Sequence, residues 1–142
     1  EVHGAYGLIL NNYGPDNMVG SVNIEVAEGM TAKQIHALTL KIQRDISETY
    51  GIYLAVGIYA YDNNPEHLEF QEEVRKTVMK HKGAMQLHGF IVDEKQKSVS
   101  FDVVTDFSVK NRKAFCHSLE EELESLHPEY KFYVNPDLDY CD

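Results

Sequence analysis

Cysteine is scarce in this chain, and the spacing of its two cysteines excludes several classes of small domain. Cys116 and Cys141 occur in no C-x-x-C or C-x-x-H pattern, so neither belongs to a zinc-finger motif. Two thiols are also too few for a disulfide framework, and a reducing compartment suits them best. The sequence is therefore not typical of a small disulfide-rich secreted scaffold.

Long hydrophobic runs are also absent. The longest, YGIYLAVGIYAY, covers 12 residues, whereas an α-helix that spans a bilayer needs about 20. No signal peptide is recognisable, and the chain begins without methionine in a predicted strand. We expect an excised domain of a longer protein.

Basic residues are outnumbered, because 13 Lys and Arg stand against 23 Asp and Glu, which gives a net charge of −10. Such a surface repels phosphate backbones and anionic lipids and attracts cations. In most acidic domains the same charge serves only solubility. A hydrophobic content of 43% still predicts a packed globular fold.

Motifs for catalysis are missing as well. We find no glycine-rich loop that could cradle a phosphate, no Ser/His/Asp arrangement in a recognisable context, and no acid pair beside a definable cleft. We therefore expect that the chain is not an enzyme and has no catalytic residues.

The first half of the sequence predicts two strands, a helix and a third strand. In GSVNIEVA the apolar and polar residues alternate, as in a half-buried strand. Thr31 and Gln34 form a capping box at the start of a helix, and Gly51 supplies its C-terminal break. The predicted strands cover residues 5–11, 20–27 and 52–61.

The second half repeats this order after a linker-like stretch at residues 62–67, with an additional helix in front. We expect Ser108 to cap the second of its two helices and Pro128 to end that helix. The predicted elements are a helix at residues 68–82, strands at 84–93 and 98–104, the helix capped by Ser108, and a last strand from residue 129 to at least residue 134.

The two halves correspond at a separation of 77 residues, for example between Ser21 and Ser98 (98 − 21 = 77). Apolar positions coincide without a gap from residue 21 to residue 59, across a strand, a helix and a strand. We interpret this as an internal duplication. The predicted fold class is α+β, with two tandem ferredoxin-like αββαβ units, antiparallel sheets and helices on one face. The predicted domains are residues 1–62, which lack the opening helix, and residues 66–142.

Each predicted unit is small. About 60 residues bury too little apolar surface to be comfortably stable alone. We therefore expect the exposed faces to be covered by an identical chain in a two-fold homodimer. The alternative is that the two halves cover each other within one chain.

An ordered set of motifs in the first half resembles a known family. These motifs are the GAYGL opening, the YGP turn, the VNIEV strand, the TAKQIHAL helix start and the RDISETYGI helix end. Together they resemble the cytosolic C-terminal domain of cation diffusion facilitator (cation efflux) transporters over residues 4–61. LHGFIVD and SVSFDVVTDF resemble a further domain found in some bacterial members.

The resemblance implies a regulatory role and no catalytic activity. Such a domain lies on the cytoplasmic side of the cell membrane, pairs with its twin, and regulates the export of Zn, Mn, Fe or Co by proton antiport. The attached transmembrane part carries out the transport. No nucleic-acid partner is implied.

The resemblance also places metal ligands at five positions of this chain: Tyr6, Asn23, His36, Gly57 and Tyr59. Only His36 keeps a good ligand type, because zinc prefers nitrogen, sulfur or carboxylate donors. We therefore expect no required cofactor and no binuclear zinc site. Weak binding of a divalent ion such as Zn²⁺ or Mn²⁺, with His36 as a ligand, is compatible with the many carboxylates.

An alternative reading is a cytosolic ferredoxin-like module that binds RNA or protein and is unrelated to transport. RNA-binding sheets of this kind display aromatic and basic residues. The polar side of the second strand instead carries Ser21, Asn23 and Glu25. This composition and the acidic charge disfavour RNA.

Overall fold

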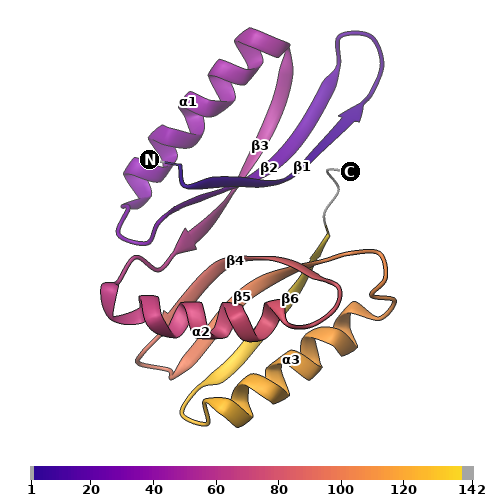
Figure 1. Cartoon of the computed structure of the whole chain (residues 1–142). Helices are drawn as coiled ribbons and strands as arrows, with labels where there is room; N and C mark the ends of the chain where they lie inside the picture. Colours follow the sequence, from indigo (N-terminus) through magenta and orange to yellow (C-terminus); the bar gives the residue numbers. More distant parts are fainter. Residues whose placement is uncertain (1, 139–142) are drawn as a thin grey trace. The chain divides into compact units, whose positions relative to one another are not determined.

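The structure is a computed structural model that describes residues 2–138 (Figure 1). The chain divides into two compact units, which we call unit 1 (residues 2–59) and unit 2 (residues 60–138). Over this described range, every helix is either too short or too polar to span a bilayer.

Unit 1 contains the two strands, the helix and the third strand that the sequence predicts. These are β1 (Gly4–Asn12), β2 (Met18–Ala27), α1 (Ala32–Tyr50) and β3 (Ile52–Tyr61), whose last two residues already belong to unit 2. The sheet order is β1-β2-β3, and β1 pairs with β2 in antiparallel orientation. Both outer strands, β1 and β3, are therefore edge strands of this sheet.

Local hydrogen bonds fix the two ends of α1 as predicted. The Gln34 amide donates to Thr31 Oγ1 (3.3 Å), and the Thr31 amide donates to Gln34 Oε1 (2.8 Å), which completes the capping box. At the other end Gly51 adopts a left-handed conformation with φ 67°, which glycine reaches without steric cost.

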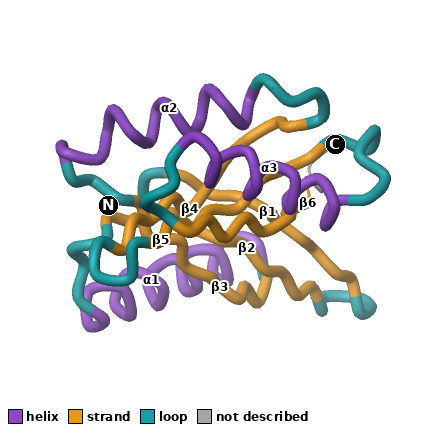
Figure 2. Tube along the Cα trace, turned by 90° about the horizontal axis from the view of Figure 1, so that it is seen from below, coloured by secondary structure: helices purple, strands orange, loops and turns teal. Residues whose placement is uncertain are grey.

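Unit 2 contains a short 3-10 helix η1 (Pro65–His67), α2 (Leu68–Met79), β4 (Ala84–Asp93), β5 (Ser98–Thr105), α3 (Arg112–Leu126) and β6 (Lys131–Leu138). Its sheet order is β4-β5-β6. Helices α2 and α3 cover the same face of this sheet (Figure 2). The α+β class with two tandem units compatible with ferredoxin-like folds is confirmed.

The prediction of antiparallel sheets was incomplete. β4 and β5 form an antiparallel hairpin, but β5 and β6 are parallel. The reason is that α3 connects β5 to β6 as a crossover helix, and such a connection returns the chain in its original direction. The second sheet is therefore mixed.

Two predicted helix ends were also wrong. α2 ends at Met79 instead of residue 82. Ser108 does not cap α3, because the helix begins at Arg112 and Ser108 lies earlier, in the turn after β5, where its hydroxyl and its amide both donate to Asp106. Asn111 takes the capping role instead, and its side chain accepts a hydrogen bond from the Ala114 amide (3.0 Å).

Each unit carries a glycine bulge in its first strand. Gly7 and Gly89 have φ values of 62° and 60°, and both lie where the register of the hairpin shifts. The bulges are 82 residues apart (89 − 7 = 82). The first strands thus correspond at a different separation from the one that relates the helices.

The third strands also depart from the 77-residue correspondence. That separation matches Leu54, which is buried in β3, with Lys131, which is exposed in β6. Over residues 131–137 of β6, the buried residues are Phe132 and Val134. Because side chains alternate along a strand, a slip of one residue exchanges the two faces. The prediction of a gap-free correspondence to residue 59 was therefore wrong in this strand.

The buried core is unevenly divided between the units. Among the described residues, the buried hydrophobic side chains of unit 1 are Ile24, Val26 and Leu54. Unit 2 has a continuous cluster that joins both helices to all three of its strands. Its members are Val74, Val78, Phe90, Val92, Val99, Phe101, Val103, Cys116, Leu119, Leu123, Phe132 and Val134.

Candidate functional site

Three of the five predicted ligand positions lie side by side in the sheet of unit 1. Tyr6 of β1 and Asn23 of β2 are direct register partners. A Cβ atom added at Gly57 of β3 would collide with the Asn23 side chain, so Asn23 lies over this glycine. Tyr59 is two residues further along β3 and is half-buried. The backbone therefore brings these positions together.

The side chains at these positions offer poor metal ligands. The Tyr6 hydroxyl donates a hydrogen bond to Glu25 Oε2 (3.3 Å). Burial, and then the negative charge of Glu25, raise the pKa of Tyr6, which keeps the phenol neutral. Gly57 has no donor atom, and the Asn23 amide is a weak neutral one. This part of the sheet lacks the donor set that zinc prefers.

His36, the one predicted ligand that keeps a good donor type, lies exposed on α1. Its backbone oxygen accepts a hydrogen bond from Thr39 Oγ1 (2.9 Å). Within residues 2–138, no three His, Cys, Asp or Glu side chains gather closely enough to hold a metal ion. Metal binding through His36 stays a prediction.

A buried carboxylate in unit 1 was not recognised as special from the sequence. Glu25 is only 7% exposed, and its Oε2 lies 2.9 Å from His3 Nδ1 in addition to the bond from Tyr6. The His3 amide donates to the Glu25 carbonyl oxygen (2.7 Å), which extends this pairing to the backbone. These contacts compensate the burial of a charged group. We infer that these contacts hold the start of β1 against β2.

A second polar cluster lies in unit 2, at residues 62–67, which the sequence predicts to be a linker. Asp62 has a side chain that is 1% exposed, and its Oδ2 lies 2.5 Å from His67 Nδ1. Its Oδ1 accepts a hydrogen bond from the Asn64 amide (2.9 Å), and its own amide donates to the Phe90 carbonyl oxygen (3.2 Å). This stretch is therefore a fixed turn that is tied to β4.

The same cluster continues to the β4–β5 turn through Glu94. His67 Nε2 lies 3.5 Å from Glu94 Oε1, which also accepts a hydrogen bond from the Tyr130 hydroxyl (2.6 Å). Lys97 Nζ lies 2.5 Å from the other oxygen of Glu94. The bonds from Lys97 and Tyr130 lower the pKa of Glu94, and the Glu94 contact raises the pKa of Tyr130 to about 12. The cluster contains no activated nucleophile, and we interpret it as structural.

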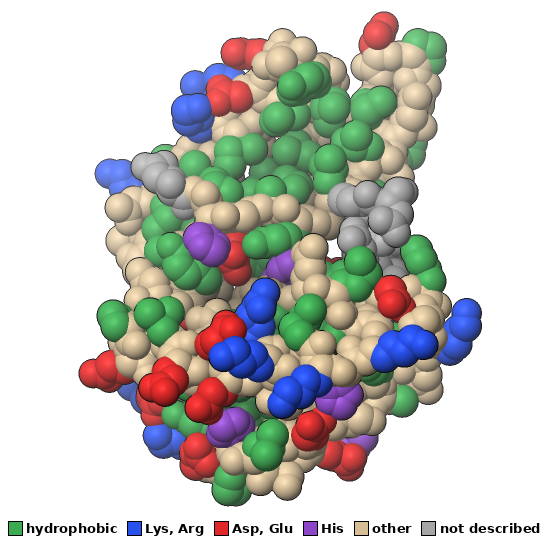
Figure 3. All heavy atoms as spheres, viewed as in Figure 1, with side chains coloured by type: hydrophobic (Ala, Val, Ile, Leu, Met, Phe, Trp, Pro, Cys, Tyr) green, Lys and Arg blue, Asp and Glu red, His purple; other side chains and the backbone are tan. Residues whose placement is uncertain are grey.

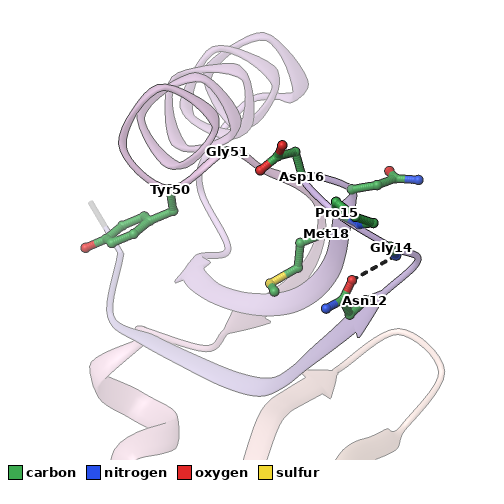
Figure 4. A pocket seen from close by; sticks show the side chains of 8 residues that line it. Asn12, Gly14, Pro15, Asp16, Met18, Tyr50 and Gly51 are labelled. Atoms are coloured by element: carbon green, nitrogen blue, oxygen red, sulfur yellow. Dashed lines mark hydrogen bonds between the residues drawn. The ribbon is translucent and has the colours of Figure 1, made fainter.

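A surface hollow of about 600 Å³ lies between the β1–β2 turn and the end of α1 (Figure 4). Among the described residues that line it, Asp16 is the only charged one. The Asn12 side-chain oxygen faces inward to the turn and accepts a hydrogen bond from the Gly14 amide (2.9 Å). One carboxylate and a few amides do not form a metal or substrate site.

Comparison with known proteins gives no relative. No family model, no curated protein and no solved structure matches this chain.

Proposed function

We propose that this chain is the regulatory, dimerising cytosolic domain of a divalent cation efflux transporter. In the full-length protein, a transmembrane part would carry out the proton-coupled antiport. The ordered motifs of unit 1 and the tandem arrangement of a ββαβ unit and an αββαβ unit support this proposal. The chain itself would perform no chemistry.

The observation that carries the proposal is the uncovered apolar surface of unit 1. Helix α1 has an apolar stripe but no buried residue, whereas the related helix α3 buries Cys116, Leu119 and Leu123. In Figure 3 hydrophobic side chains gather over unit 1, while charged side chains gather over α2. The exposed large hydrophobic residues among those described in unit 1 are Val2, Leu8, Ile9, Leu10, Tyr13, Leu40, Tyr50, Tyr53 and Ile58.

Uncovered apolar surface of this extent indicates an interaction site. The corresponding strand of unit 2, β4, shows how far the same positions are buried when other elements pack against them. At the separation set by the glycine bulges, Leu8 corresponds to Phe90 and Leu10 to Val92, which are 1% and 9% exposed in unit 2. Leu8 and Leu10 are 44% and 47% exposed. The apolar residues of unit 1 therefore match those of a packed unit in sequence, but they are exposed to the extent expected of an interaction surface.

Regulation would follow if a bound cation favours the paired form. The net charge of −10 opposes the approach of two chains, and a divalent ion reduces this repulsion. Sedimentation equilibrium with and without Mn²⁺ or Zn²⁺ tests this step. We expect a monomer–dimer equilibrium that the ion shifts toward the dimer. A chain that stays monomeric at millimolar concentration with either ion would refute the proposal.

Calorimetric titration of Zn²⁺ and Mn²⁺ tests the predicted ligand. We expect weak binding that is reduced in His36→Ala and unchanged in His117→Ala, a matched control because His117 is also an exposed helical histidine. Equal binding by both variants would show that His36 is not a ligand.

The gene provides an independent test of the attachment to a transporter. We expect it to encode several apolar segments of about 20 residues each before residue 1. A gene without such segments would favour the alternative of an unattached binding module.

A further inference from the structure

The net charge of −10 conceals an uneven distribution, because positive charge is concentrated at one end of unit 2. Half of the Lys and Arg residues of this unit lie in two short segments, the turn after α2 and the start of α3. Figure 3 shows Lys and Arg side chains at this end of the unit. The members of this basic cluster are Lys80, Lys82, Lys110 and Lys113, which are exposed, and Arg112, which is half-buried.

The two segments that carry the basic cluster lie side by side. The Gly83 carbonyl oxygen, in the turn after α2, accepts a hydrogen bond from the Asp106 amide in the β5–α3 loop (2.9 Å). A Cβ atom added at Gly83 would collide with the Val109 side chain, and its φ of 99° also favours glycine. The turn and the loop are therefore packed together, which brings the basic residues of both into one surface.

The lysines of the basic cluster are not neutralised by carboxylates of the chain. Over residues 2–138, the lysines that form an ion pair are Lys41, Lys76, Lys97 and Lys131. None of these belongs to the cluster. Arg112 Nε donates to the neutral hydroxyl of Thr105 (3.2 Å). Asp106 in the same loop offsets one of the five positive charges, so a clear excess remains.

The basic cluster also opposes the stability of the helix that it adjoins. Positive side chains in the first turn of a helix are unfavourable because of the macrodipole. The first turn of α3 contains Arg112 and Lys113 and no acidic residue. The charges of Lys80 and Lys82 in the adjoining turn add repulsion. Since the folding of unit 2 does not account for the cluster, its charge indicates a negatively charged partner.

An exposed aromatic ring lies within the basic cluster. Phe107, in the β5–α3 loop, is 67% exposed. Met85, at the adjoining start of β4, is 38% exposed. Apolar side chains beside several lysines are typical of proteins that bind the surface of anionic membranes. The apolar groups enter the boundary between headgroups and acyl chains, and the cations contact the headgroups.

A membrane surface fits this end of unit 2 better than a nucleic acid does. Proteins that bind single strands stack successive bases on several aromatic side chains, whereas this loop offers one ring. The acidic part of α3 does not prevent contact with a flat surface. Glu120 follows Lys113 by about 10 Å along the helix axis, which is about one Debye length at physiological salt, so its repulsion is largely screened.

We propose that the end of unit 2 formed by residues 80–85 and 105–113 binds the surface of membranes that contain anionic phospholipids. Phe107 enters the headgroup boundary, and the basic cluster contacts the lipid phosphates. This inference uses residues of unit 2 alone and is independent of the dimerisation proposed above.

Co-sedimentation of the parent chain with vesicles tests the inference. We expect binding to vesicles of equimolar phosphatidylcholine and phosphatidylglycerol, and none to vesicles of phosphatidylcholine alone. High salt should weaken the binding at least on the order of tenfold. Absence of binding to the anionic vesicles at low salt would overturn the inference. So would tighter binding to a single-stranded oligonucleotide than to these vesicles.

Two charge variants test whether the basic cluster makes the contact. Lys110→Glu reverses a charge in the cluster, and Lys95→Glu makes the same change in the β4–β5 turn, at the opposite end of the sheet. Both lysines are exposed loop residues, so the two variants are matched in net charge. We expect Lys110→Glu to weaken vesicle binding on the order of tenfold and Lys95→Glu to leave it nearly unchanged. Equal effects would show that overall charge governs binding and would refute the assigned surface.

A fluorescent variant tests the position of the aromatic ring. The chain contains no tryptophan, so Phe107→Trp introduces a single fluorophore at an exposed site. We expect its emission to shift to shorter wavelength, and to be shielded from an aqueous quencher, when the anionic vesicles bind. Emission that stays unchanged at saturating vesicle concentration would show that the ring remains in water, which contradicts the proposed contact.

Discussion

Removal of the two carboxylates that close β6 gives the sharpest test of the structure of unit 2. Glu124 accepts a hydrogen bond from the Phe132 amide (3.1 Å), and Glu120 accepts one from the Val134 amide (2.9 Å), which closes the outer edge of this strand. The side chains of Glu120 and Glu124 are 25% and 30% exposed, while Phe132 and Val134 are 0% and 5% exposed. The double variant Glu120→Ala/Glu124→Ala leaves both amides without an acceptor and shielded from water.

The expected loss of stability follows from these two hydrogen bonds. A hydrogen bond to a charged group contributes about 1.5–3 kcal/mol when it is buried. We take about 1 kcal/mol for each, because solvent reaches part of both carboxylates. The sum of about 2 kcal/mol corresponds to a decrease of roughly 8–16 °C in the Tm of a domain of this size.

The matched control is Glu120→Gln/Glu124→Gln. Glutamine keeps a side-chain oxygen as acceptor and loses only the charge, which includes the exposed ion pair between Glu124 and Lys131 (2.8 Å). We expect about half of the loss, measured by thermal unfolding followed by circular dichroism. Equal decreases for Ala and Gln would show that charge, and not the capping of the amides, stabilises β6. A decrease under 1 °C for the Ala variant would refute the account altogether.

Three further predictions concern side chains of unit 2. Asp62→Asn should destabilise the unit by about 2 kcal/mol in urea unfolding, because it replaces a buried carboxylate that makes hydrogen bonds to His67 and to the Asn64 amide; an unchanged midpoint would contradict this role. The Tyr130 phenol, whose contact with Glu94 raises its pKa to about 12, should stabilise the fold fully below pH 10 and progressively less up to pH 12; an NMR titration of the Tyr130 ring should show a lower pKa in Glu94→Gln than in the parent. Cys116, whose pKa burial raises to about 11, should resist alkylation at pH 8 in the native protein and react after unfolding, which peptide mapping would verify; rapid native labelling would contradict the burial.

The elements of the fold could be predicted because their signals are local. Thr31, Gln34 and Gly51 fix the ends of α1 through hydrogen bonds within a few residues, and all three were recognised from the sequence. Ser108 was misassigned because α3 begins only at Arg112, so that Asn111 occupies the capping position. Ser108 instead belongs to a turn in which its hydroxyl donates to Asp106, two residues earlier.

The polar clusters could not be predicted because they depend on tertiary contacts. Nothing in the sequence around Asp62 indicates that its carboxylate becomes buried against His67, or that Glu94 approaches from another turn. The closed edge of β6 shows the same limit, since Glu120 and Glu124 occur in an ordinary acidic helix segment. The parallel pairing of β6 requires knowledge of where α3 returns the chain.

The sparse core of unit 1 makes its folding depend on whatever covers α1. With three buried hydrophobic residues among those described, unit 1 should melt at a lower temperature than unit 2, as a separate transition. Any companion that binds only the ordered form raises this first transition and leaves the second in place. The difference between the two melting temperatures would then measure how much of unit 1 is bound to its partner. Unit 2 would serve as the internal reference.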